Sequence, residues 1–197
     1  MKVRKVKVDL NIAPLMLPVA HGRHAKDMVV LHETVSPDYP GFADILGVAR
    51  YMPRNGLGIH GIVDGEGNFA WDVYGDTHVL YHAASGHGGV NTRSIGIEQV
   101  SRVMVQFPDK QRRWEWWWQR EAQIDKVAKV LAYLHRIHAI PLVYSLGRAP
   151  GVTTHWQVSK TFDVPGGHQD CHPRHLGGYY PALRVIHRAQ YFYRRGY

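Results

Sequence analysis

The 197-residue sequence contains a single cysteine, Cys171. One cysteine excludes an intramolecular disulfide, so the fold does not depend on oxidation. The sequence also lacks the CxxC pairs of structural zinc fingers and the HExxH motif, which places two zinc ligands on one helix. The thiol of Cys171 is therefore expected either to be free or to bind a metal.

Long apolar runs are also absent, since none approaches the ~20 residues that a membrane helix requires. We therefore expect no membrane span. The first 27 residues begin with basic side chains, as a signal peptide does, but Asp9 and Asn11 interrupt the part that should be apolar. No signal peptide is recognised, and we predict that residues 1–27 form a basic arm or edge strand while residues 28–197 form one domain.

Acidic side chains are scarce relative to basic ones: 16 Asp and Glu oppose 24 Lys and Arg, a formal net charge of +8. This excess predicts attraction to polyanions, such as nucleic acids, anionic lipids or the anionic polymers of bacterial walls. The segment DKQRRWEWWWQR at 109–120 mixes basic and aromatic residues as single-strand-binding grooves do. Tryptophans that anchor a helix start, with solvated arginines, explain it better, so we expect no nucleic-acid partner.

Strand and helix patterns alternate along the chain, which predicts an α/β domain with a central mixed β-sheet flanked by helices. Strands are predicted at 28–34 and 94–100, a hairpin that turns at 64–68, and helices at 41–52, 115–138 and 181–194. Residues 151–178 are rich in Gly, Pro and His and have no sustained period. We predict an irregular loop there.

Ionisable side chains gather in that loop and at the ends of the predicted strands, where open α/β sheets build their sites. They are His32, His60, His82, His87, Glu98, His155, His168, Asp170, Cys171 and His172. A lone histidine at a strand end is more often structural than a ligand. Catalytic zinc takes three protein ligands from such residue types and leaves the fourth position to water. The collection as a whole therefore indicates a metal centre.

Five segments, in chain order, resemble the zinc-dependent type 2 N-acetylmuramoyl-L-alanine amidases. That family shares its fold with peptidoglycan recognition proteins and includes many bacteriophage endolysins. The segments are VVLHET at 29–34, GIHGIVDGEGN at 58–68, LYHAASGHGGVNTRSIGIEQV at 80–100, GVTTHWQVS at 151–159 and GGHQDCHP at 166–173. The long third segment is the most specific, and the order of all five is more specific still.

The resemblance implies a peptidoglycan-recognition-protein-like fold in which residues 28–197 form a zinc amidase domain. His32 and His155 would be zinc ligands, so the predicted strand at 28–34 would present its imidazole to a metal. Family members often carry Lys or His two places before the ligand acid, which favours Asp170 as the third ligand. Cys171 stays an alternative because a thiolate also binds zinc well. Neighbours on an extended chain point to opposite sides, so one ion is not expected to bind both.

The resemblance also implies roles for the remaining candidates. Glu98 would take the proton of the attacking water and pass it to the leaving nitrogen, and His168 would stabilise the tetrahedral oxyanion. His60 and His82 match positions that line the family's groove, and we assign them with Asn91 to substrate binding. Packing and hydrogen bonding explain the two histidines equally well, and Asn91 also suits a turn before the strand.

Two positions depart from the family pattern. Ile59 stands where the hairpin usually has Tyr, so any role of that phenol is lost. His172 and Pro173 replace the usual terminal Pro-Gly, which leaves the third ligand open.

The implied function is zinc-dependent hydrolysis of the amide bond between the N-acetylmuramoyl lactyl group and L-alanine in bacterial peptidoglycan. We expect a monomeric, bacteriolytic and hence antimicrobial phage enzyme. It would remain in the host cytoplasm until release and then act at the cell wall, helped by attraction to anionic wall polymers. The alternative is a non-catalytic module of the same fold that binds peptidoglycan without cutting it.

Overall fold

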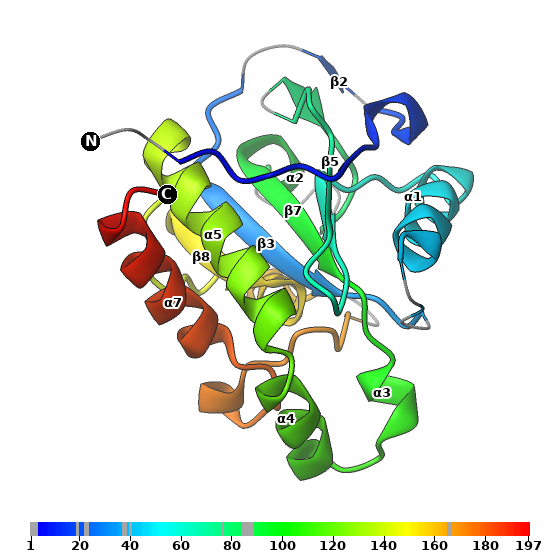
Figure 1. The fold of residues 1–197 in the computed structure, drawn as a ribbon, viewed down its shortest axis with the longest axis vertical. Coiled ribbons are helices and arrows are strands. Elements are labelled where there is room, and N and C mark those ends of the chain that lie inside the picture. Colours follow the sequence, from blue (N-terminus) through cyan, green and yellow to red (C-terminus); the bar gives the residue numbers. More distant parts are fainter. Residues whose placement is uncertain are drawn as a thin grey trace.

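The computed structural model describes residues 4–18, 20–21, 24–36, 39, 41–75, 77–83, 89–164 and 167–197. Its centre is a six-stranded sheet, whose order is β1 (Leu10–Asn11), β5 (Phe69–Trp71), β4 (Gly61–Val63), β7 (Ser94–Gln99), β3 (Met28–Glu33) and β8 (Gly151–Thr154) (Figure 1). Neighbouring strands are parallel except in the β4–β5 hairpin. A separate antiparallel pair joins β2 (Ala20–His21) to β6 (His78–Val79). The mixed sheet confirms the predicted α/β class.

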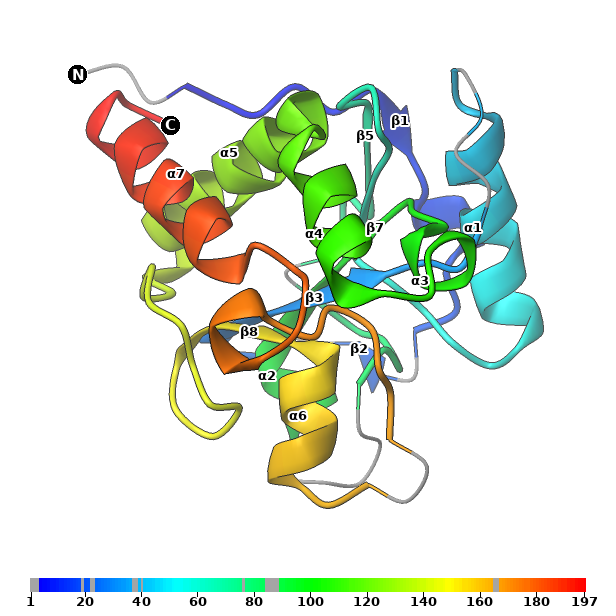
Figure 2. The same ribbon diagram turned by 90° about the horizontal axis from the view of Figure 1, so that it is seen from below.

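Helices cover both faces of the sheet. On one side of β3 and β8 lie α4 (Lys110–Trp118), α5 (Glu121–His138) and α7 (Ala182–Arg194), and on the other lie α2 (Val90–Arg93) and α6 (His155–Thr161) (Figure 2). The remaining helices are α1 (Ala43–Arg54), α3 (Val103–Gln106) and the 3₁₀ turns η1 (Ala13–Leu15) and η2 (Arg174–Leu176). No helix in the described part of the chain is both long and apolar enough to cross a membrane.

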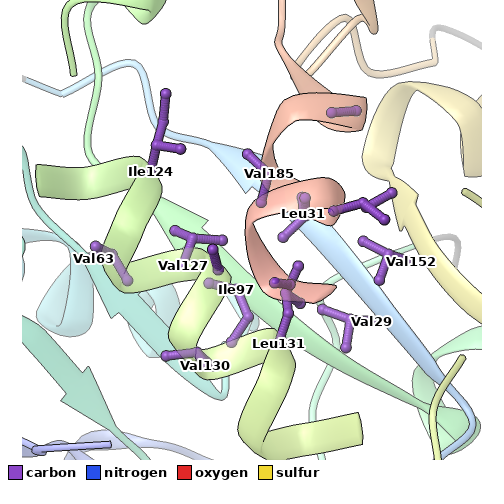
Figure 3. Close-up of a cluster of buried hydrophobic side chains, with 14 of the residues drawn as sticks. Val29, Leu31, Val63, Ile97, Ile124, Val127, Val130, Leu131, Val152 and Val185 are labelled. Atoms are coloured by element: carbon purple, nitrogen blue, oxygen red, sulfur yellow. The ribbon is translucent and has the colours of Figure 1, made fainter. Parts of the chain in front are cut away.

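The main core lies between the sheet and α5. Val29 and Leu31 of β3 and Ile97 of β7 point toward Val127 and Leu131 of α5 (Figure 3). Each of these side chains is at most 1% exposed, and burying one of them fully stabilises the fold by about 1.5–3 kcal/mol. Since side chains alternate along a strand, His32 lies on the opposite face of β3 from this core.

That opposite face carries smaller clusters. Met28 and Val30 of β3 pack with Val158 of α6, while Ile62 of β4 packs with Ile45 of α1. The parallel register pairs His32 with Glu98 of β7. Both side chains therefore lie at the same end of the sheet, on the face against which α1 and α6 pack.

The helix predicted at 115–138 is wrong in one respect, because the structure has two helices with a break at Gln119 and Arg120. The first, α4, is capped by Asp109, whose carboxylate accepts a hydrogen bond from the Arg112 backbone N–H. The fully buried Trp117 packs edge-to-face on Tyr180, with ring centroids 5.0 Å apart. Trp117 therefore anchors the last turn of α4 in the core, one residue before the helix ends.

The irregular loop predicted at 151–178 is also partly wrong, because β8 and α6 lie in it. β8 pairs along its whole length with β3. The Thr154 hydroxyl then accepts a hydrogen bond from the Gln157 backbone N–H and caps α6. With four and seven residues, the two elements are too short to give a sustained period.

Candidate active site

Three side chains with lone-pair donors converge at the end of the sheet. His32 is in β3, and His155 follows β8 directly; Leu31 pairs with Thr154, so the two histidines are the next residues of adjacent strands. Asp170 reaches them from the loop after α6, and its carbonyl accepts a hydrogen bond from the Trp156 N–H. The ligand atoms of His32, His155 and Asp170 all lie within 4.8 Å of one another.

The distances within this group suit a cation. His32 Nδ1 is 3.1 Å from His155 Nδ1, which is 3.2 Å from Asp170 Oδ2. Lone pairs at such separations repel unless a proton or a cation lies between them. Two imidazoles and a carboxylate are also a ligand set of catalytic zinc, in which the fourth coordination position is left to water or substrate. These residues therefore fit the ion that the family resemblance implies.

The electrostatics favour the metal-binding forms of His32 and Asp170. Burial lowers the pKa of His32 to about 4, and the charge of His155 acts in the same direction. Burial opposes ionisation of Asp170, but its close contacts with His155 and His32 outweigh burial and hold the pKa of Asp170 below its usual range. Neutral imidazole and ionised carboxylate are the forms that bind metals.

The structure brings Asp170, and not Cys171, to the two imidazoles. The Cys171 side chain is fully buried in the core beneath α5 and α7. Its Sγ lies 3.8 Å from the Gln99 amide nitrogen, and burial raises the pKa of the thiol. The thiol is therefore not available to the candidate metal centre.

Glu98 and His168 flank the three donors. The Glu98 carboxylate has no hydrogen-bond or ion-pair partner among the described residues, and burial, with the charges of Asp170 and Glu33, raises its pKa well above the usual range. The His168 ring stacks on His155 with centroids 3.9 Å apart. His168 is more open, with a side chain 63% exposed, and stands at the mouth of the site.

A cleft of about 800 Å³ surrounds these groups. Besides the candidate site residues, several other side chains line it: Met52, Leu57, Tyr81, His82, Asn91, Met104, Val164 and Gln169. Apolar walls with a few convergent polar groups are typical of a binding site.

The three residues assigned to substrate binding are placed differently from one another. His82 and Asn91 lie on the cleft wall, although they are only 8% and 6% exposed. The Asn91 side-chain oxygen accepts hydrogen bonds from the backbone N–H groups of His82 and Ala83, so it shapes the turn. His60 is fully buried, does not line the cleft, and accepts a hydrogen bond from the Gly96 N–H.

One other histidine from the sequence, His172, does not join the three donors. His172 stacks on Trp156, with ring centroids 4.0 Å apart, and its Nε2 donates to the Leu176 carbonyl. His87 lies outside the described residues.

A buried polar network behind His32 was missed by the sequence analysis. The Glu33 carboxylate accepts hydrogen bonds from the hydroxyls of Ser101 and Tyr179. The Gln99 side chain accepts one from Tyr180 and donates one to the His32 carbonyl. Only the unusual polarity of Glu33 and Gln99 within buried strands could have indicated these contacts. The network fixes the backbone that carries His32.

Comparison with known proteins gives one matching family model and several similar folds. Residues 22–173 match the family model described as N-acetylmuramoyl-L-alanine amidase. The fold resembles the hydrolase AmiA of Staphylococcus aureus in complex with its ligand, with TM-score 0.63 and 20% identity over 100% of this chain and 87% of that one. It also resembles the PlyG catalytic domain (TM-score 0.62, 16% identity, 96% of each chain). A third is the N-acetylmuramoyl-L-alanine amidase LysC of Clostridium intestinale URNW (TM-score 0.55, 15% identity, 94% of this chain and 99% of that one). At such identities the structural likeness concerns the fold alone. No curated protein sequence matches the chain.

Proposed function

Since the chain belongs to the N-acetylmuramoyl-L-alanine amidase family, we propose that it is a zinc hydrolase acting on bacterial peptidoglycan. It cuts the amide bond between the N-acetylmuramoyl lactyl group and L-alanine. The observation that carries this proposal is the convergence of His32, His155 and Asp170 within 4.8 Å, at one end of a cleft that Glu98 also lines.

His32, His155 and Asp170 would hold the zinc ion. When bound there, zinc supplies a Lewis acid that polarises the amide carbonyl and makes a water molecule acidic. His32 lies in β3 and His155 directly follows β8, the neighbouring strand, so their separation is fixed by the paired backbone of the sheet. Rigid support of this kind keeps ligand atoms in place without a bound substrate.

Glu98 is the general base and acid of this proposal. It accepts a proton from the attacking water and returns it to the leaving nitrogen of L-alanine. Burial raises the pKa of Glu98 above the usual carboxylate range, which supports this double role because the ionised carboxylate is then a stronger proton acceptor.

His168 lies at the rim of the cleft and assists the reaction from there. Its ring stacks on His155, and its Nδ1 is 3.7 Å from Asp170 Oδ1, which is too far for a hydrogen bond. The single N–H of the neutral ring is therefore available to donate to the oxyanion of the tetrahedral intermediate. Ile59 stands where relatives carry Tyr, and its fully buried side chain offers no donor for this step.

We assign this activity to phage-induced host lysis. The enzyme would accumulate in the host cytoplasm and act on the wall after release, with anionic wall polymers attracting its net positive charge of +8. In this proposal residues 1–27 are a basic arm or edge strand and residues 28–197 are the zinc amidase domain, which acts as a monomer.

The direct test is to incubate the purified protein with bacterial cell walls and to quantify new amino termini and new reducing sugar ends. The proposal predicts new amino termini only, loss of activity with a zinc chelator, and recovery when zinc is added back. Release of reducing ends would overturn it, because that product comes from cleavage of the glycan.

Two matched variants sharpen this assay. Glu98→Gln should keep zinc and lower the rate by roughly 10²–10⁴-fold, the usual contribution of a general acid–base group. Glu115→Gln makes the same chemical change on the exposed surface of α4 and should leave the rate unchanged. Wall binding without metal and without any cleavage would instead identify a non-catalytic peptidoglycan-binding module.

A further inference from the structure

A chain of hydrogen bonds leads from His32 away from the cleft. His32 Nε2 lies 3.1 Å from His82 Nδ1, and His82 Nε2 lies 3.1 Å from the Ser94 hydroxyl. The same hydroxyl lies 2.5 Å from the carbonyl oxygen of Val90. All four residues are buried, with exposed fractions of 8% or less.

The proton positions in this chain follow from its last member. A carbonyl oxygen can only accept, so the Ser94 hydroxyl donates to Val90 and must accept from His82 Nε2–H. A neutral imidazole carries one N–H, so His82 Nδ1 is left as an acceptor. His32 therefore donates through Nε2–H, which leaves the lone pair of His32 Nδ1 facing Asp170 and His155.

The surroundings of His82 hold its ring in one place. A Cβ atom on Gly96 would lie 2.7 Å from both Cγ and Nδ1 of His82, so only glycine leaves room for the ring. The Asn91 side chain fixes the His82 backbone. The Lys26 ammonium donates to the carbonyls of Thr92 and Ser94 and so anchors the start of β7.

We propose that His82, held by Ser94, is a positioning residue that fixes the tautomer of His32 and so presents the Nδ1 lone pair to the metal. This role is distinct from the contact with substrate that the sequence predicts for His82. It rests on the proposed function for the identity of the metal, whereas the tautomer itself is a property of the metal-free chain.

A matched pair of variants separates this role from simple packing. His82→Asn keeps an acceptor close to the position of Nδ1, whereas His82→Leu has a similar shape without one. Loss of a residue that orients a metal-binding histidine typically weakens metal affinity about 10–100-fold. In competition with a chromophoric chelator, the Leu variant should bind zinc about 10–100-fold more weakly than wild type. The Asn variant should stay much closer to wild type.

A second measurement reads the tautomer without metal or activity. Imidazole ¹⁵N shifts of the metal-free wild-type protein should report His32 with its proton on Nε2. His82→Leu should give a mixture of tautomers, and so should Ser94→Ala, which removes the acceptor for His82. Ser94→Thr keeps the hydroxyl and should restore the wild-type pattern.

Two results would overturn the inference: a proton on Nδ1 of His32 in the metal-free wild type, or equal zinc affinity in the Leu and Asn variants. If His82→Leu does not fold, as judged by circular dichroism, the ¹⁵N comparison of Ser94→Ala with Ser94→Thr decides. If the wild type binds no zinc, the proposed function fails, yet the tautomer measurement still accepts or rejects the role of His82.

Discussion

At the scale of single residues, the sequence did not decide whether Asp170 or Cys171 is the third metal ligand. Both side chains are zinc donors, and the alternation of an extended chain only predicts that one ion does not bind both. The backbone at Cys171 is in fact left-handed, with φ of 55°, and its thiol lies in the core. Whether Asp170 or Cys171 faces the two histidines depends on this local turn, and no pattern in the sequence predicts the turn.

The third ligand can be tested with two substitutions. Asp170→Asn should weaken zinc binding by at least about 10–100-fold, since that is the effect of losing a residue that only supports a ligand. Cys171→Ala should leave zinc affinity unchanged and lower the free energy of unfolding, because it empties a fully buried site. Isothermal titration and chemical denaturation measure the two quantities, and the reverse pattern of zinc affinities would assign Cys171 as the ligand.

Asp44 carries a separate prediction about pH. It is buried near the start of α1, and its Oδ2 has no hydrogen-bond partner among the described residues. Burial raises the pKa of Asp44 to about 6, and the charge of Asp64 adds to the shift. Since the folded-state pKa lies above the unfolded value of 3.8, this contribution to stability is complete below that value and is lost as the pH rises through about 6.

Replacing this carboxyl by an amide removes the titration. In Asp44→Asn, the free energy of unfolding should fall less between about pH 4 and pH 7 than in the wild type. Urea denaturation at a series of pH values provides the comparison. Parallel pH profiles for the two proteins would contradict the assignment of a raised pKa to Asp44.

At the scale of elements, the sequence predicted those whose pattern is long enough to be recognised. β3 and β7 were predicted because their apolar residues end at clear turn signals, and α7 because its apolar stripe runs over three turns. β8 and α6 were missed because β8 is defined by its pairing with β3 and α6 by the Thr154 cap. The pairing of β8 is a tertiary contact, and the cap of α6 is a single local hydrogen bond, so neither produces a period in the sequence. Because His155 follows β8 and begins α6, the candidate site depends on elements that the sequence pattern does not reveal.

Gly96 connects β7 to the site. Gly96→Ala should lower the free energy of unfolding by roughly 1–3 kcal/mol, because its Cβ would lie 2.6 Å from Ile59 and 2.7 Å from His82. Zinc affinity should fall as well, since the His82 ring must move. Gly47→Ala is the matched control: no atom lies within 4 Å of its Cβ position in α1, and a helical alanine should stabilise the protein by about 0.5–1 kcal/mol. Equal effects of the two substitutions on stability would contradict this account.

At the scale of the whole molecule, the fold brings residues 32, 98, 155 and 170 to one end of the sheet. The order of the five family-like segments was sufficient to predict the family, and the parallel strands of the mixed sheet explain the clustering, because their carboxyl ends meet at one edge. The exact neighbours were not predictable, since they depend on strand register and on the turn before Cys171.

The net charge of +8 gives a prediction at the same scale. Attraction to anionic walls acts over a Debye length that shrinks from ~10 Å at 0.1 M salt to ~3 Å at 1 M. Wall lysis should therefore slow over this range, while the cleavage of a small soluble amide substrate should change little. If lysis is indifferent to salt, long-range attraction has no part in wall targeting.

The most direct test of the central claim is X-ray absorption at the zinc edge on the purified, zinc-loaded protein. The account predicts one zinc per chain, with two imidazole nitrogens and carboxylate or water oxygen at about 2.0–2.2 Å. The signal should be lost in His155→Ala. A sulfur ligand at about 2.3 Å, or a protein that holds no zinc, would contradict it.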